Sequence, residues 1–141
     1  MEIYFRLITD AAALSEACRE LSAEAIVGFD TETTELDPYK GELRLVQLSG
    51  RKSTVVVDLR AFPDRADLEP LRVLLSAESP RKVAHNAKFD AKWVGYHLGV
   101  EVGGVFDTYL ASQLIAAGES DRRLRTDPEG IQPRQVRSPR T

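Results

Sequence analysis

An apolar run that ends abruptly in two carboxylates constrains the fold of this chain more than any other feature. Residues 25–29 read Ala-Ile-Val-Gly-Phe, and Asp30 and Glu32 follow closely. The run is typical of a strand buried in a sheet. Side chains two residues apart on a strand point to the same face. The two carboxylates therefore repel each other unless a cation or a proton lies between them.

The other periodicities predict an α/β domain, which suits a chain of 141 residues with 43% hydrophobic content. A three-stranded antiparallel start is followed by alternating helices and strands. That order predicts one mixed sheet with helices on both faces. The expected strands are 3–8, 25–32, 43–49, 54–59, 82–85 and 102–106, and the expected helices follow Thr9 or Asp10 and span 68–75, 88–98 and 108–117.

Charge and composition change near residue 118. Residues 1–118 hold 13 basic and 18 acidic side chains, whereas residues 119–141 hold six arginines and four acids. The acidic body offers no general attraction to nucleic acid but does not exclude it, because bound metal ions go uncounted. Residues 119–141 are rich in arginine and proline and poor in large apolar residues, so we predict a disordered tail. A nucleic-acid arm is the alternative. We therefore expect a domain over residues 1–118.

The single cysteine, Cys18, excludes an intrachain disulfide and lies on the apolar stripe of an expected helix. We predict a small buried hydrophobe there rather than a reactive thiol. The sequence has no apolar stretch of about 20 residues that would span a bilayer, and its start lacks the layout of a signal peptide. We expect a cytoplasmic protein with no membrane partner.

A second polar cluster, residues 85–90, reads His-Asn-Ala-Lys-Phe-Asp at an expected strand-to-helix junction. Asp90 alone could be a helix N-terminal acid that complements the dipole. Asp30 and Glu32 could be a solvated surface pair, but the apolar strand before them favours a ligand site, since ligands in open α/β sheets bind at the carboxyl ends of strands. Carboxylate oxygens together favour Mg²⁺ or Mn²⁺, and no Cys/His cluster with zinc spacing is present.

Two segments resemble motifs of a known family. Residues 29–37, Phe-Asp-Thr-Glu-Thr-Thr-Glu-Leu-Asp, resemble the first motif of the DEDD 3′–5′ exonucleases, and residues 86–90 resemble the second. Residues 45–48 and 106–108 also resemble runs of that family. The likeness covers about residues 20–118. It is nearest to the proofreading domain of family A DNA polymerases, with ribonuclease D and the RecQ-helicase-linked exonucleases as further relatives.

The resemblance implies a ribonuclease H-like fold, two Mg²⁺ or Mn²⁺ ions, and a single-stranded nucleic-acid 3′ end as partner. Leu36 would press against the terminal base. The threonine-rich loop after Glu32 favours DNA over RNA. The residues implied as catalytic metal ligands are Asp30, Glu32 and Asp90, and those implied as substrate-binding are Thr31, Leu36, His85 and Asn86.

The family's third motif is missing. It supplies a fourth aspartate, preceded at short spacing by a tyrosine or histidine, and neither Asp107, Asp121 nor Asp127 fits. We read Asp107 as a helix cap first and a ligand second. We therefore expect a C-terminally truncated domain with weak or no activity. One face of its sheet would be uncovered and open to aggregation or a protein partner.

Two other functions stay open. A non-catalytic remnant would bind metal or nucleic acid without cutting. A phosphatase with an aspartyl nucleophile would need a second aspartate in place of Glu32, and would leave residues 86–90 unexplained. Of the remaining candidates, His85 could be a satisfied polar residue, His97 a partly exposed structural one, and Trp93 and Tyr96 core residues.

Overall fold

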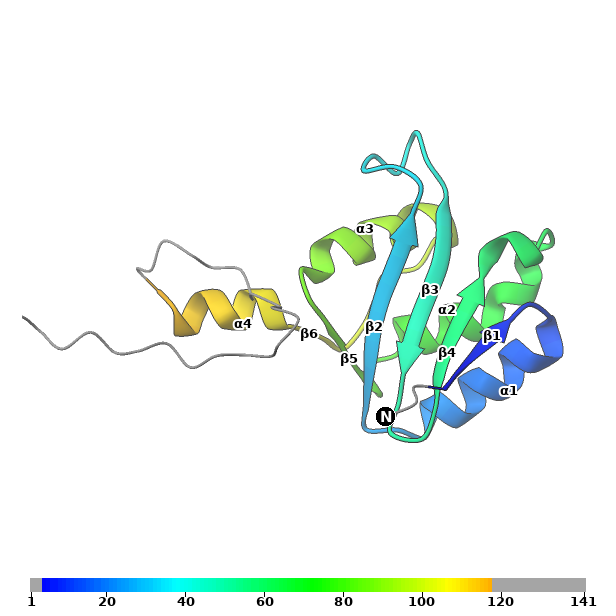
Figure 1. Ribbon diagram of the computed structural model, residues 1–141, viewed down its shortest axis with the longest axis horizontal. Helices are drawn as coiled ribbons and strands as arrows, with labels where there is room; N and C mark the ends of the chain where they lie inside the picture. Colours follow the sequence, from blue (N-terminus) through cyan, green and yellow to red (C-terminus); the bar gives the residue numbers. More distant parts are fainter. Residues whose placement is uncertain (1–3, 118–141) are drawn as a thin grey trace, which may run out of the picture.

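The computed structural model describes residues 4–117, which form a six-stranded sheet with four α-helices (Figure 1). The expected calls on residues 119–141 lie outside the described residues. The strand order is β1-β4-β3-β2-β5-β6. The strands are β1 Phe5–Ile8, β2 Ile26–Thr33, β3 Leu43–Ser49, β4 Thr54–Asp58, β5 Arg81–Ala84 and β6 Val105–Asp107, and the helices are α1 Ala11–Ser22, α2 Glu69–Ser76, α3 Ala87–Leu98 and α4 Thr108–Ile115, with short 3₁₀ turns at Leu59–Ala61 and Arg65–Leu68.

The sheet is mixed, as predicted. Strands β2, β3 and β4 form an antiparallel meander, whereas β1 joins β4, β5 joins β2 and β6 joins β5 in parallel. In this register Asp30 lies opposite Gln47 of β3, and Gly28 lies beside Val83 of β5. The strand that carries the two carboxylates is therefore central, with a neighbour on each side.

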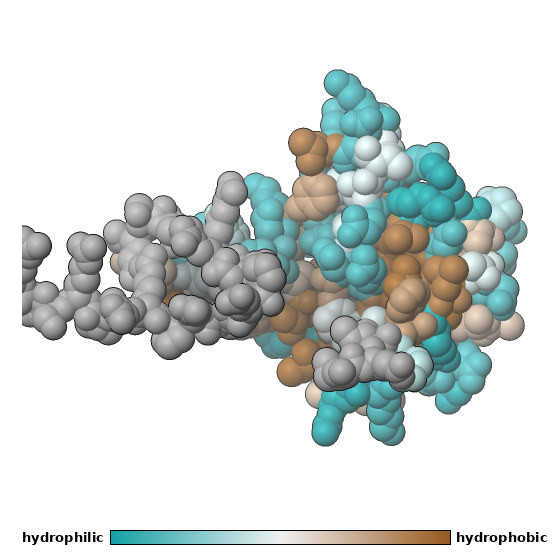
Figure 2. All heavy atoms as spheres, in the orientation of Figure 1, coloured by the Kyte–Doolittle hydropathy of each residue, from teal (hydrophilic) through white to brown (hydrophobic). Residues whose placement is uncertain are grey.

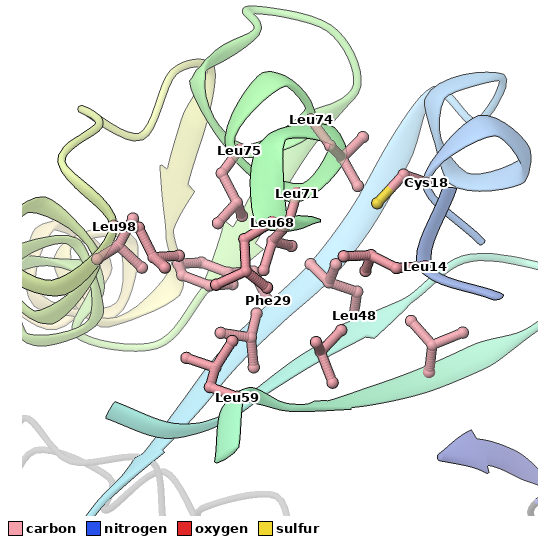
Figure 3. Packing of buried hydrophobic residues seen from close by; sticks show 14 of the residues in the cluster. Leu14, Cys18, Phe29, Leu48, Leu59, Leu68, Leu71, Leu74, Leu75 and Leu98 are labelled. Atoms are coloured by element: carbon pink, nitrogen blue, oxygen red, sulfur yellow. The ribbon is translucent and has the colours of Figure 1, made fainter. Parts of the chain in front are cut away.

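The core lies between one face of the sheet and helices α1, α2 and α3 (Figure 3). Phe29, Leu48 and Val57 alternate with polar or half-buried residues along their strands and are at most 5% exposed. Cys18 is also buried, as predicted, and burial raises the pKa of its thiol to about 11. The predicted mixed sheet flanked by helices is confirmed, and the large buried side chains of the central strands alternate toward the face that these three helices cover.

The opposite face of the sheet is open in the described part of the chain, and it is the face turned toward the viewer in Figure 2. Hydrophobic residues gather on the β1–β4 side, where Phe5 is 60% and Leu7 56% exposed. Helix α4 buries none of its residues, and Leu114 and Ile115 are almost fully exposed. An uncovered sheet face was expected from the missing third motif.

None of the helices between residues 4 and 117 combines the length and hydropathy that a membrane crossing requires.

Candidate active site

Asp30 and Glu32 lie together on the open face of the sheet. The alternation of β2 buries Val27, Phe29 and Thr31 on the helical side and leaves both carboxylates exposed on the other. Gln47, which faces Asp30 across the ladder, donates a long hydrogen bond from Nε2 to Glu32 Oε1 at 3.5 Å. The two carboxylates therefore share one surface, with an amide beside them.

Asp90 approaches the same strand from α3. Its side chain is 3% exposed, and Oδ1 accepts the backbone N–H of Thr31 at 3.1 Å and the Thr31 hydroxyl at 2.5 Å. Burial raises the pKa of Asp90, the Thr31 hydroxyl opposes that rise, and the negative charge of Asp30 adds to it. Asp90 is thus a buried carboxylate whose ionisation a nearby cation would favour.

The turn between β5 and α3 is held by Asp107. Asn86 adopts a left-handed conformation (φ 60°, ψ 52°), which asparagine tolerates better than most residues. The Asp107 carboxylate accepts the backbone N–H groups of Asn86 and Ala87, each at 2.9 Å. It also caps α4 by accepting the N–H of Tyr109 at 2.8 Å. Asp107 therefore acts as a cap and a positioning residue, which confirms its first interpretation.

The pKa of Asp107 lies below its ordinary value. Burial acts to raise it, but the backbone N–H groups of Tyr109, Ala87 and Asn86 together outweigh burial by stabilising the charged form. The charged form of Asp107 is therefore favoured more than that of an ordinary aspartate.

His85 is exposed at the end of β5 and contacts Thr108. The Thr108 hydroxyl donates its single proton to the carbonyl oxygen of Ala84 at 3.2 Å. In its 3.0 Å contact with His85 Nδ1 the hydroxyl must therefore accept, so Nδ1 carries the proton. In the tautomer with the proton on Nδ1, Nε2 is an acceptor. His85 makes the expected polar contact through Nδ1, but the ring is exposed rather than buried.

Leu36 is 85% exposed in the loop between β2 and β3, which extends beyond the sheet (Figure 1). Of the aromatic residues of α3, Trp93 is fully buried, as predicted, whereas Tyr96 is 53% exposed and is not a core residue. His97 is half-buried, as expected for a structural residue, and contacts the carbonyl oxygen of Pro38.

The donor set fits a divalent ion in its chemistry. Asp30, Glu32 and Asp90 offer only carboxylate oxygens, which hard cations prefer, and the charge of Asp30 helps to raise the pKa of Asp90. As the side chains stand, no three His, Cys, Asp or Glu groups among residues 4–117 are arranged closely enough to hold a metal. Binding would therefore require the carboxylates to turn toward one another.

The structure thus brings together the sequence motifs of β2 and α3 at Thr31 and Asp90. The Thr31 side chain, expected to bind substrate, is 7% exposed and its hydroxyl proton is directed at Asp90. Gln47 and Thr108 were not singled out as site residues, although the resemblance to the family included both of their segments. The alternation of β3 was the available signal for Gln47, because it places that side chain on the carboxylate face.

The chain is similar to known proteins over most of its length. Residues 5–125 match the family described as 3′–5′ exonuclease. The chain is 34% identical over 114 residues to ribonuclease D of Nitrobacter hamburgensis, covering 81% of this chain and 29% of the relative. It is 35% identical over 111 residues to DNA polymerase I of Aquifex aeolicus, covering 79% of this chain and 17% of the relative. Further relatives are also named ribonuclease D.

The structure of Brucella melitensis NrnC with bound Mg²⁺ superposes with a TM-score of 0.68 and 27% identity, covering 88% of this chain and 58% of that one. The chain spans less than a third of the length of the ribonuclease D and of the DNA polymerase I described above. The ribonuclease H-like α/β fold and the match over residues 5–125 lead to one conclusion: this chain belongs to the family of 3′–5′ exonucleases.

Proposed function

We propose that this chain is an exonuclease domain that hydrolyses phosphodiester bonds from the 3′ end of single-stranded nucleic acid. The observation that supports this best is the meeting of β2 and α3. The hydrogen bonds from Thr31 to Asp90 place a third carboxylate beside the strand that carries Asp30 and Glu32, although 59 residues separate Thr31 from Asp90.

Asp30, Glu32 and Asp90 would hold two divalent ions, Mg²⁺ or Mn²⁺. When bound, such ions supply an activated water and compensate the charge that develops on the leaving oxygen. The chain's own residues orient the ligands. Thr31 fixes one oxygen of Asp90, Gln47 supports Glu32, and Asp107 fixes the turn from which α3 begins. The magnesium complex of NrnC, a structural neighbour, supports the choice of ion.

Leu36, His85 and Asn86 would bind the 3′-terminal nucleotide. All three are exposed, and they flank the carboxylate strand through the β2–β3 loop and the β5–α3 turn. Leu36 offers an apolar surface to the terminal base, whereas His85 offers Nε2 as an acceptor for a hydroxyl. The buried Thr31 is reassigned in this proposal from substrate binding to the positioning of Asp90.

RNA is as good a candidate substrate as DNA. The sequence favoured DNA from the threonine-rich loop, yet four relatives with 32–37% identity are named ribonuclease D. A 2′-hydroxyl is the group that distinguishes the two.

We propose the cytoplasm as the location of the domain. A single, buried and unpaired cysteine, Cys18, suits a reducing compartment.

The second candidate is a domain that binds nucleic acid without cutting it. The observation in its favour is that no three acidic or histidine side chains of the described segment are arranged to hold a metal as they stand. A protein partner that covers the open face of the sheet would supply further ligands.

The test is hydrolysis of 5′-labelled single-stranded RNA and DNA in Mg²⁺, Mn²⁺ or EDTA. The expected result is metal-dependent, stepwise loss of 3′ nucleotides, reduced at least roughly a hundredfold in Asp30→Ala. Glu16→Ala is the matched control, because Glu16 is an exposed acid on α1, remote from the site.

Two results would contradict hydrolysis at this site. Cleavage that persists in Asp30→Ala at the rate of Glu16→Ala would place the activity elsewhere. A folded protein that binds the strand but never shortens it, in any of the three conditions, would favour the non-catalytic domain.

A further inference from the structure

The loop between β2 and β3 is a built structure. The backbone N–H of Tyr39 donates to Asp37 Oδ1 at 3.0 Å, and the N–H of Gly41 donates to the Asp37 carbonyl oxygen at 3.2 Å. At the base of the loop, the N–H of Thr34 donates to the Glu42 carbonyl oxygen at 3.1 Å. These bonds fix the backbone on both sides of Tyr39.

Helix α3 holds this loop in place through His97. The Pro38 carbonyl oxygen lies 3.1 Å from His97 Nε2 and can only accept, so Nε2 carries the proton. The imidazole stacks on Trp93 with ring centroids 5.2 Å apart and an interplanar angle of 10°. Because Trp93 is fully buried, the loop is attached to the core of the domain.

Two exposed tyrosines meet where the loop and the helix touch. The rings of Tyr39 and Tyr96 lie edge to face, with centroids 4.8 Å apart and an interplanar angle of 71°. Tyr39 is 73% and Tyr96 53% exposed. Each ring thus leaves aromatic surface to solvent while its backbone is fixed. We call this pair the tyrosine step.

Free cations flank the tyrosine step in an otherwise acidic body. Lys40 follows Tyr39 in the loop, and Lys92 lies one helical turn before Tyr96 on the same side of α3. Both lysines are exposed, and neither takes part in an ion pair among residues 4–117. Aromatic faces beside unpaired cations are the combination that binds single-stranded nucleic acid.

The tyrosine step and the carboxylates are carried by connected elements. The loop that carries Tyr39 follows β2, which ends at Thr33, one residue after Glu32, and α3 begins three residues before Asp90 and carries Tyr96 farther along. If the 3′ end of a nucleic-acid strand lies at Asp30, a nucleotide on the 5′ side of the terminal one would contact the tyrosine step.

We propose that Tyr39 and Tyr96 form a stacking site for a base of single-stranded nucleic acid, on the 5′ side of the terminal nucleotide. Lys40 and Lys92 compensate the phosphates that flank this base. The placement of this base on the 5′ side of the terminal nucleotide rests on the proposed function, in which the 3′ end lies at the carboxylates. Because every base has an aromatic face, the site accepts any sequence, and it makes affinity depend on strand length.

Binding without cleavage tests this site. Fluorescence anisotropy with 5′-labelled single strands in EDTA gives the dissociation constant for a ten-nucleotide strand, and competition gives it for an unlabelled dinucleotide. We expect Tyr96→Ala and Tyr39→Ala to weaken binding of the long strand by roughly five- to tenfold and to leave the dinucleotide unchanged. Tyr96→Trp, which keeps an aromatic face, should restore long-strand binding.

Tyr4→Ala is the matched control, because Tyr4 is a tyrosine with 78% exposure placed just before β1, three strands away from β2 in the sheet. The site is rejected if Tyr96→Ala binds the long strand as tightly as Tyr4→Ala does. It is also rejected if the variant weakens the dinucleotide and the long strand equally, because that pattern indicates a general structural effect.

The outcome is separable from that of the hydrolysis assay. If the wild-type chain never cuts, but Tyr39→Ala binds the long strand more weakly than wild type, the stacking site is supported and the exonuclease function is rejected. If the wild-type chain cuts, but both alanine variants bind the long strand as tightly as wild type, the function is supported and the stacking site is rejected.

Discussion

Thr31 donates two hydrogen bonds to one oxygen of Asp90, one from its backbone N–H and one from its hydroxyl. The pair joins the strand that carries Asp30 and Glu32 to the helix that carries the third carboxylate. Thr31 therefore fixes the position of Asp90 and at the same time favours its charged form, since hydrogen bonds to a carboxylate lower its pKa.

Replacing Thr31 with valine should impair catalysis more than folding. Thr31→Val removes the hydroxyl bond and keeps the backbone bond, so we expect a loss of roughly 10–100-fold in kcat/KM. The pKa of Asp90 should rise further, which moves the acid limb of the pH–rate profile upward. Thr33→Val is the control, because within residues 4–117 the Thr33 hydroxyl bonds only the Glu35 carbonyl oxygen in the loop. If the acid limb of the pH–rate profile does not move in Thr31→Val, the Thr31 hydroxyl does not control the pKa of Asp90.

Neutralising Asp90 should stabilise the domain in the absence of metal. The pKa of Asp90 is raised in the folded state by burial and by Asp30, so the folded protein binds this proton more tightly than the unfolded chain does. Stability from Asp90 is therefore present at low pH and is lost as pH rises through the raised pKa. Asp90→Asn keeps an acceptor for Thr31 and carries no charge.

Thermal unfolding in EDTA checks this prediction. We expect Asp90→Asn to melt roughly a few degrees above wild type at pH 7 and at the same temperature as wild type near pH 3. The variant should have no exonuclease activity. A lower melting temperature at pH 7 would show that the ionised carboxylate is not a cost to the folded state.

Divalent ions should raise the stability of the wild-type domain. A ligand that binds only the folded state at 100 times its dissociation constant adds about 2.7 kcal/mol. Titration of Mn²⁺ into the protein, followed by thermal unfolding, measures the shift. Asp30→Ala should lose most of it and Glu16→Ala should retain it. An equal shift in both variants would mean that the ion binds outside this site.

Removing the Asp107 carboxylate should cost about 2 kcal/mol of stability, at the upper end for a helix cap, because it accepts three backbone N–H groups. Its pKa is depressed, so its contribution is present above the ordinary value of 3.8 and is lost as pH falls through the folded value. Urea unfolding of Asp107→Ala at pH 7 measures the cost. Asp64→Ala, which removes a cap with one bond to Ala66, should cost less; the reverse order would contradict the role of Asp107.

Gly104 should not tolerate a side chain. Its φ is +63°, and a Cβ there would overlap the backbone carbonyl of Glu78. Gly104→Ala should therefore destabilise the domain by roughly 2 kcal/mol or more. Gly95→Ala is the comparison. Gly95 lies within α3, and a Cβ added there would meet the Val100 carbonyl oxygen at an ordinary contact distance of 3.8 Å. The Gly95→Ala substitution should therefore be neutral or mildly stabilising. Chemical denaturation of both variants measures the difference.

Much of the fold follows from local patterns. The expected strand 43–49 coincides with β3, and the helix predicted over 88–98 begins one residue earlier as α3. The strand expected over 102–106 instead spans Val105–Asp107. The reason is tertiary: Gly103 donates to the Leu75 carbonyl oxygen and packs against the backbone after α2, so these residues leave the sheet.

The candidate site was predictable only where one element supplied it. The alternation of β2 places Asp30 and Glu32 together, and that pattern is visible in the sequence. The contact of Thr31 with Asp90 joins residues 59 positions apart, and so does that of His97 with Pro38. Side-chain hydrogen bonds of such separation leave no periodic signal, because they depend on how the elements pack.

The Asp107 carboxylate has a consequence for the order in which the domain assembles on the ribosome. Domains generally fold from their N-terminus as synthesis proceeds, and Asn86 and Ala87 leave the exit tunnel well before Asp107 does. Their N–H groups gain this acceptor only when β6 has emerged and paired with β5. The start of α3, and with it the orientation of Asp90, is therefore completed by a residue synthesised afterwards. A nascent chain arrested before residue 107 would carry both exonuclease motifs without a finished site.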